Sequence, residues 1–353
     1  MISPTVIDLF AGAGGLSLGL HTARWKVVAA VEWDRAASQT YQANFPHTTM
    51  FADVRDVDFR AFYGVDLVAG GPPCQPFSVA GKQLSSADPR DMVPQFIRAV
   101  HEIRPRAFLM ENVPGLLTQK NLLYVKRFIV QLEELGYSIT YKKLLASHYG
   151  VPQDRERVFF IGMRDSEAAT FVFPEPTHGF GRANPFVSVA KALQDTPYCE
   201  PNKAIVTYAK NPILRPSPWA GMLVNGQGRP LNEHEPSLTI PATAGGNRTH
   251  ILDPQGVLLA YHAELMAGSK PRVGIVEGVR RLNMRESARL QSFPDDFIFH
   301  GTKTRQYMQI GNAIPPLLAE VVAKRLHETL FEKSKNHLTG SKQLSFFSSW
   351  ASD

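Results

Sequence analysis

The sequence predicts an α/β fold with a mostly parallel sheet and flanking helices, joined to a smaller loop-rich domain. Over residues 5–163, short apolar β-rich runs alternate with amphipathic segments, which is typical of strands joined by crossover helices. After Met163 this alternation ends, and residues 164–280 are rich in Pro, Gly, Asn and Thr. The predicted domains are therefore residues 1–163 and 164–280, with residues 281–332 returning to the first domain.

The expected elements follow from the spacing of apolar residues. Short β-rich runs predict strands at residues 5–10, 26–33, 65–70, 106–111, 137–145 and 157–162. Helical spacing predicts helices at residues 15–23, 34–44, 91–103, 122–135, 284–292 and about 315–332. Asp34 and Asp91 stand at expected N-cap positions. Within the loop-rich segment we expect only short strands, such as residues 256–261, and we expect the polar tail 333–353 to be poorly ordered.

Composition excludes several classes of protein. The 353 residues are 44% hydrophobic and 20% charged, which is typical of a globular protein. No stretch approaches the roughly 18 to 20 apolar residues of a transmembrane helix, and the N-terminus does not resemble a signal peptide, so we expect a cytoplasmic protein. Two cysteines, Cys74 and Cys199, make a disulfide framework or a cysteine-based zinc site unexpected, and we expect no metal. The net charge of +6 suits a polyanionic partner.

Three consecutive strand ends carry residues suited to a cofactor that contains adenosine. The first ends in small residues that let a ligand approach the backbone. The second ends in a carboxylate that can hold ribose hydroxyls, followed by an aromatic ring that can stack on adenine. The third ends in a carboxylate that can accept from the adenine amine. These are, in order, Asp8 to Gly15, Glu32 with Trp33, and Asp53 with Val54.

A cysteine follows the fourth main strand in an unusual context. Two prolines stiffen the approach to Cys74, and the polar Gln75 and Ser78 follow it, which a buried structural cysteine does not need. Glu111 ends the next strand, so its carboxylate is expected at the same edge of the sheet. The alternate arginines Arg155 and Arg157 point to one face if their segment is extended.

A thiolate, a carboxylic acid and an adenosine cofactor together suit methyl transfer to carbon 5 of a pyrimidine. Thiolate addition at C6 makes C5 nucleophilic, and a carboxylic acid at N3 stabilises the charge that develops there. Because a stacked base is out of reach, the target must be flipped out of the duplex.

With these motifs in this order, the chain resembles the DNA (cytosine-5)-methyltransferases of prokaryotic type over residues 5 to about 325. The resemblance implies a Rossmann-like fold, S-adenosyl-L-methionine as cofactor and Cys74 as the attacking residue. It also extends the motifs to residues 281–297 and 309–313. The cofactor residues it implies are Asp8, Phe10, Gly12, Gly14, Gly15, Glu32, Trp33, Asp53, Val54, Gly71, Pro72 and Asn312. The catalytic residues are Cys74, Glu111, Arg155 and Arg157, and the DNA-binding residues are Gln75, Ser78, Thr239 and Arg248.

In this family the segment between the later motifs reads the DNA sequence, so residues 164–280 become the expected target-recognition domain. Thr239 matches its recognition element, and Arg248 can read a guanine or contact a phosphate. We expect a monomer that acts on double-stranded DNA and associates with the nucleoid through it, as an orphan enzyme or beside a separately acting restriction endonuclease.

The alternative is a tRNA cytosine-5 methyltransferase of the same fold, although its Cys-Phe-Thr element is not apparent. Adenine-N6 and cytosine-N4 methyltransferases have an aromatic residue in place of Cys74, two-cysteine RNA methyltransferases need a second catalytic cysteine, which Cys199 does not suit, and a non-catalytic relative would be expected to lack Cys74 or Glu111.

Overall fold

The computed structural model describes residues 3–47, 49–73, 91–167, 170–226, 228–242 and 246–332. The predicted site residues Cys74, Gln75 and Ser78 lie outside this part of the chain, as does the tail 333–353. Within the described ranges, no helix has the length and apolar character that crossing a membrane requires.

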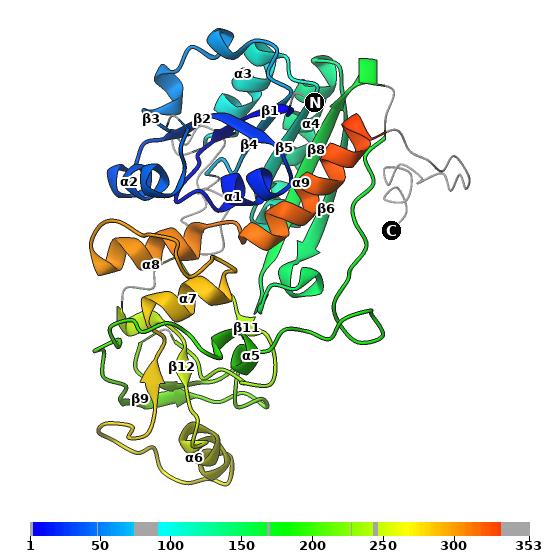
Figure 1. Ribbon diagram of the computed structural model, residues 1–353. Coiled ribbons are helices and arrows are strands. Elements are labelled where there is room, and N and C mark those ends of the chain that lie inside the picture. Colours follow the sequence, from blue (N-terminus) through cyan, green and yellow to red (C-terminus); the bar gives the residue numbers. More distant parts are fainter. Residues whose placement is uncertain are drawn as a thin grey trace, which may run out of the picture.

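A seven-stranded sheet forms the centre of the upper lobe (Figure 1), in the order β3-β2-β1-β4-β5-β8-β6. Its strands are β1 (Thr5–Leu9), β2 (Lys26–Glu32), β3 (Thr49–Phe51), β4 (Leu67–Gly70), β5 (Ala107–Asn112), β6 (Tyr137–Leu145) and β8 (Glu156–Arg164). Only β8 runs antiparallel to its neighbours β5 and β6. A short link, rather than a crossover helix, joins β6 to β8, which permits this direction. The predicted mostly parallel sheet is confirmed.

Helices cover both faces of the sheet. On one face, α1 (Gly15–Thr22) and α9 (Pro316–Phe331) share a hydrophobic core with β1 and β4. On the other face, α3 (Val93–Ile103) and α4 (Leu122–Glu134) pack on β1, β4 and β5. At the N-terminus of α2 (Arg35–Asn44), the side chain of Asp34 accepts a hydrogen bond from the Ala37 N–H, so this predicted N-cap is confirmed. Asp91 stands one position before the observed cap, Met92, and accepts from the Val93 N–H.

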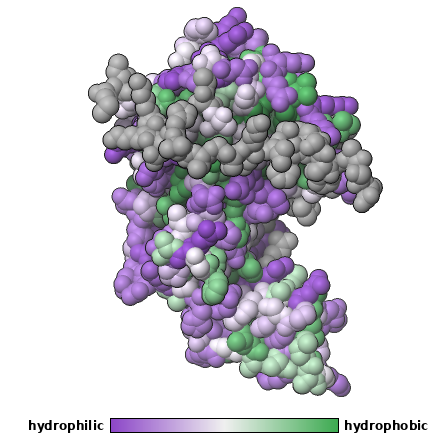
Figure 2. All heavy atoms as spheres, turned by 90° about the vertical axis from the view of Figure 1, so that its right-hand side faces the viewer, coloured by the Kyte–Doolittle hydropathy of each residue, from purple (hydrophilic) through white to green (hydrophobic). Residues whose placement is uncertain are grey.

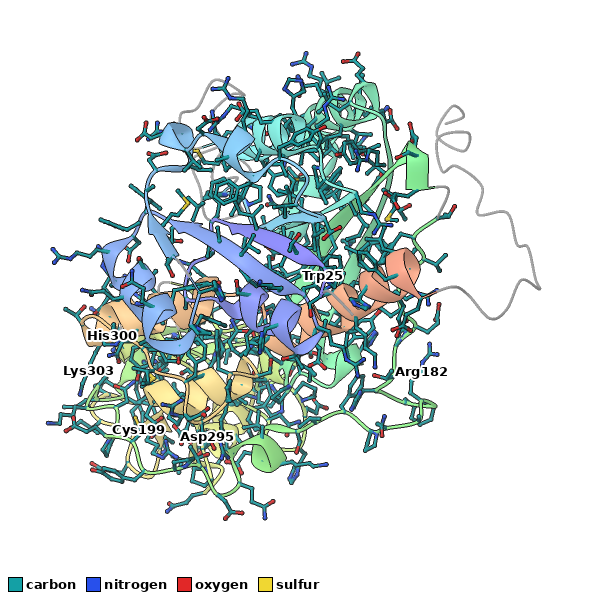
Figure 3. The ribbon with its side chains drawn as sticks, turned by 45° about the horizontal axis from the view of Figure 1, so that its top comes forward. Trp25, Arg182, Cys199, Asp295, His300 and Lys303 are labelled. Carbon is teal, nitrogen blue, oxygen red and sulfur yellow. The ribbon has the colours of Figure 1, made fainter. Side chains whose placement is uncertain are left out.

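Helix α1 and the adjoining Trp25 pack directly against α9, although the two segments are far apart in the sequence. Trp25 is almost fully buried beside α9, and its indole N–H donates to the Ala323 carbonyl. Figure 3 labels Trp25 in the upper lobe and Cys199 in the lower one. A Cβ on Gly19 of α1 would lie 2.5 Å from the Cβ of Ala319, so the two helices approach closely enough to require glycine there.

The lower lobe contains most of the loop-rich segment (Figure 1). Its elements are α5 (Val189–Leu193), β9 (Tyr208–Ile213), β10 (Met222–Val224), β11 (Ser237–Leu238), β12 (Ile251–Leu252) and α6 (Val257–Met266). The chain returns through β13 (Arg280–Arg281), α7 (Met284–Leu290) and α8 (Lys303–Asn312). Figure 2 shows apolar side chains on the surface at the end of this lobe, where α6 lies. The exposed large apolar residues of α6 are Leu259 and Met266, and Val273 and Ile275 in the segment after it are also exposed.

The strand predicted at residues 256–261 is wrong, because these residues form the first part of α6. Asp253 accepts hydrogen bonds from the N–H groups of Val257 and Leu258 and so fixes the first turn. Gly256 adopts the left-handed conformation that the helix entry requires. A short apolar run fits a buried helix as well as a strand, and Asp253 was the overlooked start signal.

Candidate active site

The end of β1 forms a loop of unusual backbone shape before α1. Phe10, Gly12 and Gly14 all have positive φ, at 59°, 57° and 94°. A Cβ on Gly14 would lie 2.4 Å from the Phe45 ring, whereas one on Gly12 would meet nothing within 4 Å. The loop is therefore packed against the protein at Gly14 and open at Gly12, which suits the approach of a ligand to the backbone.

Glu32 connects the end of β2 to this loop. Its two carboxylate oxygens accept from the Gly12 N–H at 2.7 Å and from the Asp34 N–H at 2.6 Å. Burial raises the pKa of Glu32. The next residue, Trp33, leaves 70% of its surface exposed. A fixed carboxylate beside open backbone and an unpacked indole fits the adenosine part of S-adenosylmethionine.

Asp8 is predicted to bind the cofactor, but the structure buries it completely beneath α1. Its Oδ2 atom accepts from the Ser17 hydroxyl at 2.6 Å. The Ser17 hydroxyl also shares a hydrogen bond of 2.5 Å with the Tyr41 hydroxyl, and the ring nitrogen Nε2 of His47 lies 2.6 Å from the Tyr41 oxygen. Burial raises the pKa of Asp8 to about 7. These contacts make Asp8 a support for the loop.

The third predicted strand end is partly engaged within the protein. Asp53 caps a short 3-10 helix and pairs with Arg55, whose guanidinium lowers the pKa of this carboxyl. Val54 is buried, and its carbonyl accepts from Arg98. The contacts predicted between the cofactor and Asp53 or Val54 stay a prediction.

The segment that leads to Cys74 is held at both ends. The Pro72 carbonyl accepts from the side-chain amide of Asn112, and the Pro73 carbonyl accepts from the Met92 N–H. Pro73, three residues after the end of β4, and Met92, just before α3, therefore lie side by side. A Cβ on Gly71 would lie 2.9 Å from Glu111 Oε2, which places this carboxylate over the backbone three residues before Cys74.

Glu111 and Arg157 form a buried ion pair at this edge of the sheet. The Arg157 Nε atom lies 2.8 Å from Glu111 Oε1, and about a tenth of each side chain is exposed. Burial raises the pKa of Glu111, although Arg157 and Arg155 oppose that shift. The Oε2 atom, which faces Gly71, has no hydrogen-bond partner among the described residues.

Arg155 is close enough to this pair to act on it electrostatically, but it forms its own hydrogen bonds elsewhere. It donates to the carbonyls of Ile240 at 3.1 Å and Gly311 at 2.6 Å, and only 1% of its surface is exposed. The alternation that we expected to put Arg155 and Arg157 on one face does not give them the same partners. Arg155 is a positioning residue in this arrangement.

The two predicted base-reading residues both lie on the exposed surface. Thr239 follows β11, which pairs with β7 (Gln153–Asp154), and its hydroxyl donates to the Asp154 carbonyl at 2.7 Å. Arg248 ends a short 3-10 helix, and the buried His250 lies two residues later, with its Nε2 atom 3.1 Å from the Thr239 carbonyl. Asn312, the last predicted cofactor residue, ends α8 and is also exposed.

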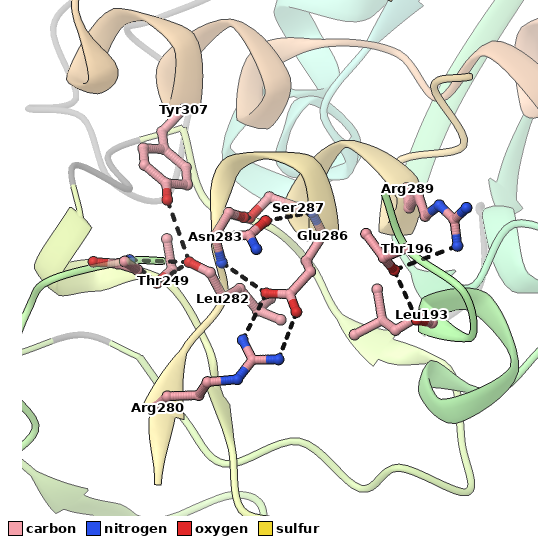
Figure 4. Close-up of polar contacts among 11 residues, drawn as sticks. Leu193, Thr196, Thr249, Arg280, Leu282, Asn283, Glu286, Ser287, Arg289 and Tyr307 are labelled. Carbon is pink, nitrogen blue, oxygen red and sulfur yellow. Dashed lines mark hydrogen bonds and ion pairs between the residues drawn. The ribbon is translucent and has the colours of Figure 1, made fainter. Parts of the chain in front are cut away.

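Polar contacts that the sequence did not predict hold the segment in which the chain returns from the lower lobe to the upper one (Figure 4). Glu286 and Asn283 form a capping box at the start of α7, and Arg280 donates to Glu286 through its Nη1 and Nη2 atoms. The Leu282 carbonyl accepts from Thr249 and from Tyr307 of α8. Among the residues described, no three His, Cys, Asp or Glu side chains gather as a metal site would require.

The fold and this strand edge define a methyltransferase, and comparison with known proteins gives the family. The family model described as C-5 cytosine-specific DNA methylase matches residues 4–328, so the chain belongs to that family. Its cofactor is therefore S-adenosylmethionine.

Named relatives agree with this assignment. The chain is 33% identical to the type II methyltransferase M.FnuDI of Fusobacterium nucleatum, over 94% of this chain and 96% of that one. It is 37% identical to M1.HphI of Haemophilus parahaemolyticus, over 92% and 86%. The crystal structure of a Spodoptera frugiperda DNMT2 variant shares the fold with a TM-score of 0.68 at 20% identity, covering 94% of this chain and all of that one.

Proposed function

We propose that this protein methylates C5 of a flipped-out cytosine within a specific DNA sequence, with Cys74 as nucleophile and Glu111 as the acid at N3. The observation that carries this proposal is the Glu111 carboxylate. It is buried, it is oriented by Arg157, and it has one oxygen facing Gly71. A carboxyl group in this place can serve the base that Cys74 attacks.

Cys74 and Glu111 have different roles in the proposed reaction. The Cys74 sulfur adds to C6 of cytosine, and Glu111 donates a proton or hydrogen bond at N3, which stabilises the developing charge. The raised pKa of Glu111 favours the protonated form that this step needs. S-adenosylmethionine, when bound, supplies the methyl group that C5 receives. A base then removes the C5 proton, and the Cys74 sulfur leaves.

Residues 164–280 serve as the target-recognition domain in this proposal, with Thr239 and Arg248 at the DNA. Their exposure, and the tie of Thr239 to Asp154 next to Arg155, support that role. The type II names of the relatives support a place in a restriction-modification system, with a separate endonuclease. We further propose that the enzyme is a monomer and that DNA binding associates it with the nucleoid.

A covalent trap tests the chemistry. In the presence of S-adenosylmethionine, we expect wild type to form a stable adduct with a duplex that carries 5-fluorocytosine at the target. After methyl transfer the fluorine on C5 cannot leave as a proton, so the Cys74 sulfur stays bound to C6. Cys74→Ala should form none while still binding DNA and cofactor, and Cys199→Ala, the matched control, should react like wild type. Adduct formation by Cys74→Ala would overturn the assignment. Methylation of tRNA in place of duplex DNA would favour a tRNA cytosine-5 methyltransferase.

A library of duplex sites tests recognition. If Arg248 reads a guanine, Arg248→Ala should relax preference at one position by about 1 to 3 kcal/mol. A phosphate contact would instead weaken all sites alike and reduce the salt dependence by about one ion. Arg182→Ala, at another exposed arginine of the same segment, is the control. A sequence profile and salt dependence equal to wild type for Arg248→Ala would remove this residue from the interface.

A further inference from the structure

Arg155 is a buried arginine whose hydrogen-bond partners belong to two different parts of the site. Its Nη1 atom donates to the Ile240 carbonyl and its Nη2 atom to the Gly311 carbonyl. Its Nε atom is buried without a partner among the described residues. Both acceptors are main-chain carbonyls, so the side chain fixes the backbone of two segments relative to each other.

Each acceptor stands beside a residue with a separate proposed role. Ile240 follows Thr239, which is placed at the DNA. Gly311 precedes Asn312, which is placed at the cofactor. One guanidinium therefore connects the backbone next to the DNA-contacting residue with the backbone next to the cofactor-contacting residue.

The two backbones also touch directly. A Cβ on Gly311 would lie 2.4 Å from the Pro241 carbonyl oxygen and 2.6 Å from the Ala242 Cα atom. Such contacts leave no room for side-chain adjustment, because the opposing atoms belong to the main chain. A shift of the last turn of α8 must therefore move residues 240–242 or break this contact.

A second buried connection runs parallel to the first. The Gln153 side chain accepts from the Ile240 N–H at 2.9 Å and donates to Gln291 at 2.8 Å. Gln291 in turn donates to the Ile310 carbonyl at 2.6 Å. Both glutamines are fully buried. Together with Arg155, they join the backbone next to Thr239 to the end of α8 by hydrogen bonds between buried groups.

We propose that Arg155 couples cofactor binding to DNA recognition, so that a ligand held near Asn312 stabilises the DNA-binding position of Thr239. This inference rests on the proposed function, since it assumes that both ligands bind at these two segments. Coupling of this kind is reciprocal: if the cofactor raises DNA affinity by some factor, DNA raises cofactor affinity by the same factor.

Binding measurements test the coupling without turnover. The affinity for a duplex that contains the recognised site is measured by fluorescence anisotropy, with and without S-adenosylhomocysteine. Calorimetry gives the affinity for S-adenosylhomocysteine with and without that duplex. We expect a coupling factor of at least five in wild type and a factor near one in Arg155→Lys, which cannot reach both carbonyls with a planar fork.

Arg281 provides a matched control within the same protein. It is equally buried, donates to the carbonyls of Thr249 and Asn225, and also leaves its Nε atom without a partner among the described residues. Both of its acceptors lie in the recognition segment. We expect Arg281→Lys to lower DNA affinity by the same factor with and without S-adenosylhomocysteine, so that the coupling factor stays at the wild-type value.

Gly311→Ala perturbs the contact from the other side and covers the case in which Arg155→Lys does not fold. It should also reduce the coupling factor, because the new Cβ forces α8 away from Pro241. The proposal is overturned if wild type shows no coupling, if neither variant lowers it, or if Arg281→Lys lowers it as much. If wild type binds no DNA duplex at all, that result counts against the proposed function instead.

Discussion

The carboxyl group of Asp8 gives the protein a specific dependence of stability on pH. Its pKa is raised from 3.8 to about 7, because the side chain is fully buried and the nearby Glu32 adds to the shift. A difference of about three pKa units corresponds to about 4 kcal/mol at 1.36 kcal/mol per unit. The folded protein therefore keeps a proton on Asp8 at pH values where the unfolded chain has released it.

The direction of the effect follows from this difference in bound protons. Below about pH 4 Asp8 is protonated in both the folded and the unfolded protein, and its contribution to the free energy of unfolding is fully present. Between about pH 4 and 7 the free energy of unfolding falls by about 1.4 kcal/mol per pH unit through this group, and above pH 7 the contribution is lost. From pH 5.5 to pH 8.5 the loss is therefore about 2 kcal/mol.

Asp8→Asn removes the titration and keeps an acceptor for Ser17. Urea unfolding of both proteins, followed by circular dichroism, measures the free energy of unfolding at pH 5.5 and at pH 8.5. Between these pH values it should fall by about 2 kcal/mol less in the variant than in wild type. Ser17→Ala removes a hydrogen bond that lowers the pKa of Asp8. In this variant the fall in the free energy of unfolding should therefore extend to higher pH. Parallel curves for wild type and Asp8→Asn would refute the reasoning, because the other titrating groups are common to both.

Three further changes have defined outcomes. Glu111→Gln should abolish the fluorocytosine adduct and lower stability by about 3 to 5 kcal/mol in thermal unfolding, since it removes the negative charge that pairs with the buried Arg157; an active variant would contradict the role of Glu111. Trp33→Ala should weaken S-adenosylhomocysteine binding about tenfold in calorimetry, with an unchanged melting temperature because the indole is exposed; equal affinity would remove it from the pocket. Gly19→Ala should destabilise the protein by about 1 to 3 kcal/mol in urea, since its Cβ overlaps α9; increased stability would show that the helices separate freely.

The upper lobe could be predicted from the sequence, because the spacing of its apolar residues and the polar residues at its strand ends are local signals. The ends of β1, β2 and β5 carry the glycine loop, Glu32 and Glu111 that the sequence indicated. The extra helix α8 was missed, because its polar residues leave only a weak apolar pattern. The strand predicted at residues 256–261 was wrong for a related reason, since a short apolar run does not distinguish a helix from a strand.

The partners of the site residues depend on contacts across the chain, which no local pattern encodes. Arg155 and Arg157 are two residues apart, yet one bonds to Ile240 and Gly311 and the other to Glu111. Asp8 has the right place in the motif, but only its burial beneath Ser17 reveals its supporting role. Distances of this kind require the folded arrangement of segments that are far apart in sequence.

The bond between Trp25 and Ala323 also has a consequence for synthesis on the ribosome. The two residues are 298 positions apart, so the partner of Trp25 emerges about 15 to 60 s later at 5 to 20 residues per second. During that interval the sheet face that α9 covers is exposed to water, and the nascent chain must rely on chaperones or rapid completion to avoid aggregation. A message cut short before α9 should yield no stable enzyme, so DNA modification begins only after the ribosome has translated α9.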